Sequence, residues 1–64
     1  MVTINGEKIA ADGMTIAQYL DAEQLNPERI AVMLGDRIVP KSDFGETVLK
    51  DGDTLEVVGF VGGG

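Results

Sequence analysis

Residues 1–11 of the chain, MVTINGEKIAA, predict a β-hairpin. Val2 and Ile4 alternate with other residues, as in a strand that buries one face. Asn5-Gly6 is the dipeptide best suited to a two-residue hairpin turn, because both residues tolerate a positive φ. We therefore expect the following residues to form the returning strand of an antiparallel pair.

A helix is predicted after the hairpin. Thr15 stands three residues before Gln18, which is the spacing of a capping box, in which each side chain accepts a hydrogen bond from the other residue's backbone N–H. Apolar residues at helical spacing follow, so the pattern predicts a helix at about residues 16–24. It should end before Asn26-Pro27, because the residue before a proline is disfavoured in the α region.

Three further strands are indicated in the rest of the chain. Residues 30–34 are almost continuously apolar, which is typical of a strand buried on both faces. Farther on, Phe44, Val48 and Leu49 are expected to anchor a loop or a single helical turn. The three strands are expected at residues 30–34, 37–39 and 54–60, and turn residues or proline bound the first two.

This order of elements predicts an α+β fold of the β-grasp (ubiquitin-like) type. One helix would pack across one face of a mixed sheet, and the first and last strands would pair in parallel at its centre. We expect residues 1–60 to form this single domain and residues 61–64, Val-Gly-Gly-Gly, to form a flexible tail.

The composition excludes several classes of function. The 64 residues contain no cysteine and no histidine, so we expect no disulfide, zinc finger or thiol nucleophile, and no enzyme active site. Eleven acidic against five basic side chains give a net charge of −6, which disfavours nucleic acid because phosphates need a cationic face. No apolar run approaches the roughly 18 residues of a membrane span. We expect a cytoplasmic protein that is monomeric on its own and holds no metal or cofactor.

Four carboxylates in the last third of the chain are the obvious candidates for a cation site. They lack the alternating ligands and the distant closing glutamate of a calcium loop. We interpret them as solvated surface and turn residues: Glu46, Asp51, Asp53 and Glu56.

The run Gly62-Gly63-Gly64 is the one feature that packing and turns do not explain. Its simplest interpretation is a frayed chain end or a remnant of cloning. Glycine has no Cβ, however, so this run is thin enough to pass through a narrow channel, and the four residues from Val61 reach roughly 13 Å beyond the last strand. The carboxylate of Gly64 is ionised at neutral pH and can attack the α-phosphate of ATP to give an acyl adenylate. We therefore predict Gly64 as the reacting residue and Gly62 and Gly63 as the threading residues.

The tail is too short to specify a partner, so recognition should fall to the surface beside it. That surface should include Val58 and Phe60 on the outer face of the last strand, with Glu56 at its edge. An apolar patch with an acidic rim favours a partner with apolar pockets and basic residues. Phe60 is equally compatible with a place in the core, and both interpretations stay open.

Several segments of the sequence follow the pattern of a known family. They are INGE at 4–7, TI at 15–16, IAV at 30–32, RIVP at 37–40, LKDGD at 49–53, LEVV at 55–58 and GGG at 62–64. In these segments, which span nearly the whole chain, it resembles the ThiS family of sulfur carriers in thiamine biosynthesis. The resemblance implies that the carboxylate of Gly64 carries sulfur as a thiocarboxylate.

The resemblance also implies the partners. A ThiF-like enzyme, similar to ubiquitin-activating enzymes, would use ATP to adenylate Gly64. A persulfide on a sulfur-transfer protein, fed by a cysteine desulfurase, would then replace AMP. A ThiG-like thiazole synthase would take the sulfur into the thiazole ring of thiamine. The chain would be a protein cosubstrate with no catalytic residue and no bound cofactor of its own.

Three further classes of protein are alternatives to be weighed against this sequence. The small subunit of molybdopterin synthase also carries sulfur on a terminal Gly-Gly, and some carriers of this fold serve cysteine synthesis or tRNA thiolation. An acyl carrier would need a serine after an aspartate at a helix start, whereas Ser42 follows Lys41. The third class is a plain β-grasp interaction module, with the glycines as a linker remnant.

Overall fold

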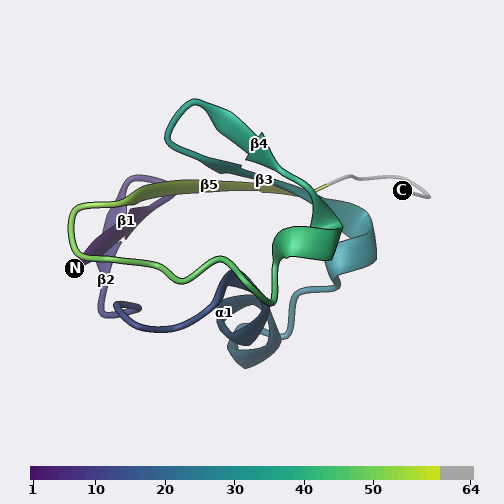
Figure 1. Cartoon of the computed structure of the whole chain (residues 1–64), viewed down its shortest axis with the longest axis horizontal. Coiled ribbons are helices and arrows are strands. Elements are labelled where there is room, and N and C mark those ends of the chain that lie inside the picture. The colour runs from purple at the N-terminus through teal and green to yellow at the C-terminus, as the bar shows by residue number, and fades with distance from the viewer. Residues whose placement is uncertain (60–64) are drawn as a thin grey trace.

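The computed structural model describes residues 1–59, which form a sheet with one short α-helix (Figure 1). In chain order the elements are β1 (Val2–Ile4), β2 (Glu7–Ile9), α1 (Ile16–Ala22), the 3₁₀ helix η1 (Pro27–Arg29), β3 (Ile30–Leu34), β4 (Arg37–Val39), the 3₁₀ helix η2 (Lys41–Asp43) and β5 (Thr54–Gly59). No helix in this part of the chain is long and apolar enough to cross a membrane. The predicted tail at 61–64 lies outside the described residues.

The hairpin and the helix start form where the sequence predicts them. Asn5 and Gly6 both have positive φ, 51° and 86°, and join β1 to β2 as an antiparallel pair. At the start of α1, the Gln18 N–H donates to Thr15 Oγ1 at 3.1 Å and the Thr15 N–H donates to Gln18 Oε1 at 2.9 Å. The capping box is therefore confirmed in both of its hydrogen bonds.

α1 ends at Ala22, two residues before the predicted end. Gln24 adopts a left-handed conformation, with φ of 60°, and its N–H donates to the Asp21 carbonyl at 3.0 Å. The Leu25 N–H donates to the Leu20 carbonyl at 2.8 Å. These two bonds form a Schellman motif, which satisfies the last carbonyls of the helix before the chain reaches the proline.

The sheet has the strand order β2-β1-β5-β3-β4 among the described residues. β1 and β5 pair in parallel, with Thr3 opposite Thr54, and β3 is antiparallel to both β5 and β4. The first and last strands therefore meet in parallel inside a mixed sheet, as predicted. β5 lies at the centre of the sheet and leads directly into the predicted tail.

α1 covers one face of this sheet, and the core lies between them (Figure 1). The helix contributes Ile16 and Leu20, both with at most 1% of their surface exposed. The strands and connecting segments contribute the remaining buried residues: Val2, Ile4, Ala11, Val32, Val39, Phe44, Leu49 and Leu55.

Two expectations about burial are wrong. β3 is not buried on both faces, because α1 covers only one of them: Val32 is fully buried, whereas the other four residues of the strand are only partly so. Val48 is not a core anchor, since 45% of its surface is exposed. The other two predicted anchors, Phe44 and Leu49, are both buried in the core.

Candidate functional site

The predicted tail chemistry falls beyond the part of the chain that the structure describes. Phe60, the threading residues Gly62 and Gly63, and the reacting residue Gly64 all lie outside residues 1–59. The described chain ends at Gly59, which pairs with Ile30 at the end of β5. The structure therefore places Gly59, the last described residue before Phe60 and the predicted tail, and the surface beside it.

β5 presents its side chains alternately to the two faces of the sheet. Leu55 is fully buried and Val57 packs against the core, so these two face α1. Glu56 and Val58 are exposed and therefore face the other side. Of the predicted docking residues, the structure brings Glu56 and Val58 to one open face next to the start of the tail. Their role in binding stays a prediction.

The sheet register adds three residues to this face that the sequence analysis missed. Ala31 lies opposite Val58, Met33 lies opposite Glu56, and Ile38 lies opposite Met33 on the edge strand β4. Ile38 has 74% of its surface exposed, the highest value among the large exposed apolar side chains of residues 1–59. The open-face patch is defined here as Ala31, Met33, Ile38, Glu56 and Val58.

The open-face patch combines apolar side chains with one carboxylate. Contiguous exposed apolar surface on a small soluble domain commonly marks a binding site. The outward direction of Ile38 could have been predicted from sequence. Side chains alternate between the two faces along a strand, so if Val39 points into the core, its neighbour Ile38 must point outward. The outward direction of Ala31 and Met33 could not be predicted, since the apolar run at 30–34 does not show which face is covered.

Two of the four carboxylates considered for a cation site, Asp51 and Asp53, have partners within the protein. Asp53 Oδ2 accepts a hydrogen bond from the Lys50 N–H at 2.9 Å, which closes the turn before β5. Asp51 pairs with the amino terminus of Met1. Within residues 1–59, no three side chains of the kinds that bind metals gather in one place.

Two charged groups with displaced pKa values, the amino terminus and Asp51, lie beside the turn that precedes β5. The amino nitrogen of Met1 lies 3.2 Å from Asp12 Oδ2 and also donates to Asp51. The hydrogen bonds with Asp51 and then Asp12 raise the pKa of the amino terminus, and the hydrogen bond from the amino terminus lowers the pKa of Asp51. This cluster lies at the end of β5 opposite to Gly59, the last described residue.

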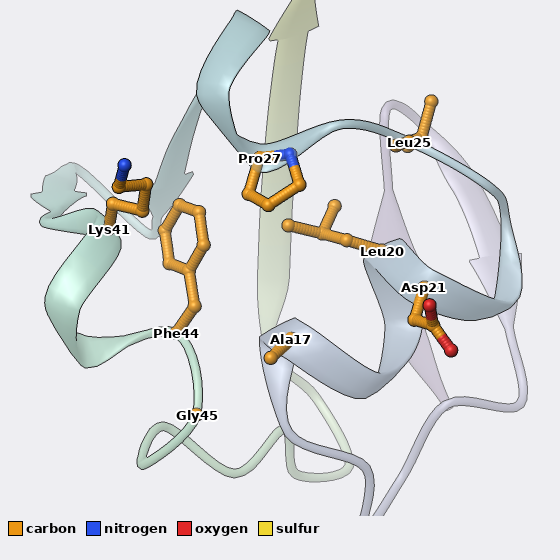
Figure 2. Close-up of a pocket in the computed structure, with 8 residues that line it drawn as sticks. All are labelled: Ala17, Leu20, Asp21, Leu25, Pro27, Lys41, Phe44 and Gly45. Atoms are coloured by element: carbon orange, nitrogen blue, oxygen red, sulfur yellow. The ribbon is translucent and has the colours of Figure 1, made fainter.

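A hollow of about 320 Å³ lies on the helix side of the molecule, between α1, the segment before η1, and η2 (Figure 2). Leu20, Leu25, Pro27 and Phe44 make most of its lining apolar, and Lys41 at its rim pairs with Glu28. Among the described residues, no buried side-chain nitrogen or oxygen lacks a hydrogen-bond partner. Asp21 and Lys41 are the charged side chains in the lining of this mostly apolar hollow.

Comparisons with known proteins agree with the fold and with the resemblance. The ThiS family model matches residues 1–64. The chain is 35% identical to the sulfur carrier protein ThiS of Bacillus subtilis over the whole of both chains. It is 38% identical to a thiazole synthase of Paramagnetospirillum magneticum over 98% of this chain, but it spans only 20% of that protein's length.

A solved structure shows the same fold. The crystal structure of thiamine biosynthesis protein ThiS from Geobacter metallireducens superposes with a TM-score of 0.78 and 30% sequence identity, over 98% of this chain and 97% of that one. The predicted β-grasp fold is confirmed by this likeness.

Proposed function

The chain belongs to the ThiS family, and from this premise we propose that it is a sulfur carrier of thiamine biosynthesis, loaded as a thiocarboxylate on Gly64. The observation that carries this proposal is the extent of the family match, which runs through the glycines at 62–64 as well as the folded domain. The match favours thiamine biosynthesis over molybdopterin synthase, cysteine synthesis, tRNA thiolation and a plain interaction module.

The loading reaction requires three chemical steps, none of which needs a side chain of this protein. An oxygen of the Gly64 carboxylate attacks the α-phosphorus of ATP, and pyrophosphate leaves. The terminal sulfur of a protein persulfide then attacks the acyl carbon, and AMP leaves. A thiol finally cleaves the sulfur–sulfur bond of the resulting acyl disulfide, which leaves the thiocarboxylate on the carrier. The protein is thus a cosubstrate and not a catalyst, and ATP binds to the partner.

The proposed partners are a ThiF-like adenylating enzyme, a sulfur-transfer protein fed by a cysteine desulfurase, and a ThiG-like thiazole synthase. The similarity to part of a longer thiazole synthase supports the last of these, because a segment like this chain belongs to the same polypeptide there. A carrier and an enzyme that act in sequence gain a high effective concentration when they are joined.

The open-face patch is the proposed docking surface for the adenylating enzyme. It spans β3, β4 and β5, and β5 is the strand that leads toward the tail, so a partner seated on Val58 is next to the end of the described chain. Glu56 and the net charge of −6 would favour a partner surface with basic residues and would mainly raise the association rate. Phe60 adjoins this surface in sequence, and it keeps its two predicted roles, a partner contact or a core residue.

Intact mass spectrometry tests the proposed function. The chain is incubated with the ThiF-like enzyme, ATP, a persulfide donor and a thiol, and omission of ATP is the control. Exchange of one carboxylate oxygen for sulfur adds about 16 Da, and fragmentation should place that mass on Gly64. An unchanged mass in the complete mixture contradicts the proposal, and so does a mass increase located on any other residue.

A further inference from the structure

The side chain of Asn5 forms two hydrogen bonds with the main chain of β5. Its Nδ2 donates to the Val57 carbonyl at 3.2 Å, and the Val57 N–H donates to Asn5 Oδ1 at 2.9 Å. Asn5 is the first residue of the hairpin turn, with φ of 51°, a left-handed conformation that asparagine tolerates better than most residues. The carboxamide therefore closes a ring between the end of β1 and a residue 52 positions later.

These two bonds continue the ladder between β1 and β5 after β1 has ended. The parallel pairing runs as far as Ile4 and Leu55, and the Asn5 N–H donates to the Leu55 carbonyl at 3.0 Å. In the same register, the next two bonds of a parallel ladder would come from the main chain of residues 5 and 7. Because the chain turns back at Gly6, the Asn5 side chain takes the place of both.

Val57, whose main chain Asn5 holds, lies close to the end of the described chain. Val57 precedes Gly59 by two residues, and Gly59 pairs with Ile30 on the β3 side. On the β1 side, the Asn5 carboxamide is the hydrogen-bonding partner of the Val57 main chain. We propose that Asn5 is a positioning residue for the adenylation of Gly64: it fixes the end of β5, and with it the point and direction from which residues 60–64 extend into the partner. This inference rests on the proposed function.

Two variants separate this role from the role of Asn5 in the turn. Asn5→Gly keeps a residue that readily adopts positive φ, so the hairpin turn persists while both bonds to Val57 are lost. Asn5→Asp also suits the turn and keeps the acceptor for the Val57 N–H, but it loses the donor to the Val57 carbonyl. Thr15→Ala is the matched control, because it disrupts another reciprocal pair of hydrogen bonds, at the start of α1 and not on β5.

The experiment measures amide hydrogen exchange by NMR and the steady-state kinetics of pyrophosphate release with the ThiF-like enzyme. In Asn5→Gly we expect the Val57 amide to exchange about tenfold faster or more, because its acceptor is lost. The kcat should fall about three- to tenfold while KM changes less than about twofold, since the patch still docks but the carboxylate is less well placed. Asn5→Asp should fall between Asn5→Gly and the unaltered chain, and Thr15→Ala should change neither quantity.

The outcomes distinguish the inference from the proposed function. Failure of the unaltered chain to support pyrophosphate release overturns the proposed function and this inference together. Normal release by the unaltered chain with an unchanged kcat in Asn5→Gly overturns the inference alone. An equal loss of kcat in Thr15→Ala also overturns it, because the loss would then follow from general stability.

Discussion

The two faces of the sheet differ sharply in how much of their apolar side chains is exposed. On the face that α1 covers, Ile4 and Leu55 have at most 4% of their surface exposed. On the opposite face of the same sheet, Val58 has 53% and Ile38 has 74% of its surface exposed. Side chains of similar size and polarity thus occupy opposite environments within one sheet.

This difference supports the proposal that the domain folds through one face of the sheet and binds through the other. One helix can bury only one face of a sheet, so the covered face must supply most of the hydrophobic stabilisation. Apolar residues on the open face contribute little to the core, and their presence there is more economically explained by a partner. The covered face holds the fold together, and the open face is the proposed docking surface.

The largest predicted effect is a difference in the free energy of unfolding between variants of two β5 residues, one on each face of the sheet. Leu55→Ala should lower the free energy of unfolding by about 2–5 kcal/mol, because it leaves a cavity in the core. Val58→Ala should change it by no more than about 0.5 kcal/mol, because that side chain is half exposed. Urea unfolding of both variants measures the difference. Equal losses would mean that the two faces contribute alike to stability.

A smaller change is expected in binding from Ile38, the most exposed apolar residue of the open-face patch. Ile38→Thr keeps a β-branched side chain, so the edge strand should persist, but it loses apolar contact with the partner. We expect affinity for the ThiF-like enzyme to fall by about 1 kcal/mol, roughly fivefold, by titration calorimetry.

Val48 provides the matched control for this experiment. It is also an exposed β-branched side chain, at 45%, but it lies outside the open-face patch, beside Thr15 at the start of α1. Val48→Thr should leave the affinity unchanged. The proposed docking surface would be wrong if Val48→Thr weakened binding as much as Ile38→Thr, or if neither change had an effect.

The smallest predicted effect is on the pH dependence of stability. It arises from the charged cluster of the Met1 amino terminus, Asp12 and Asp51, which lies beside the start of β5. The lowered pKa of Asp51 means that its contribution to stability is present above its ordinary value of 3.8 and is lost as pH falls through the lowered value. The raised pKa of the amino terminus means that its contribution is present below 8.0 and is lost as pH rises through the raised value. Asp51→Asn should therefore reduce stability most between those two limits.

Urea midpoints across about pH 2–10 measure this dependence for the unaltered chain and Asp51→Asn, with about 1 M NaCl as a control for screening. The two midpoints should converge at both ends of the range and in high salt. A difference that stays constant with pH would show that the pair of charges does not cause it. Binding to the ThiF-like enzyme should be the same for both chains near neutral pH.

The sequence was sufficient for those features that depend on neighbouring residues. The turn at Asn5-Gly6 and the cap formed by Thr15 and Gln18 are local, because their bonds join residues no more than three positions apart. Alternation along β5 likewise predicted that Val58 faces away from the core, and the structure agrees.

Most of the features that the sequence did not predict depend on long-range placement. The register that sets Met33 between Ile38 and Glu56 joins three strands, and no local pattern specifies it. The early end of α1 is a local feature that the sequence analysis also missed: Gln24 adopts a left-handed conformation, which glutamine rarely does. Which of the adjacent residues Val48 and Leu49 is buried depends on how the segment packs against the rest of the protein, and no local pattern shows that Val48 is exposed.

Whether Gly64 carries the reacting carboxylate is measured by ATP–pyrophosphate exchange with the ThiF-like enzyme, using the unaltered chain and a chain that lacks Gly64. Removal of one residue draws the carboxylate back by about 3.5 Å, out of reach of the α-phosphate. We expect exchange to be abolished while the urea midpoint stays the same as that of the unaltered chain. Exchange at the normal rate by the chain ending at Gly63 would show that Gly64 is not the reacting residue.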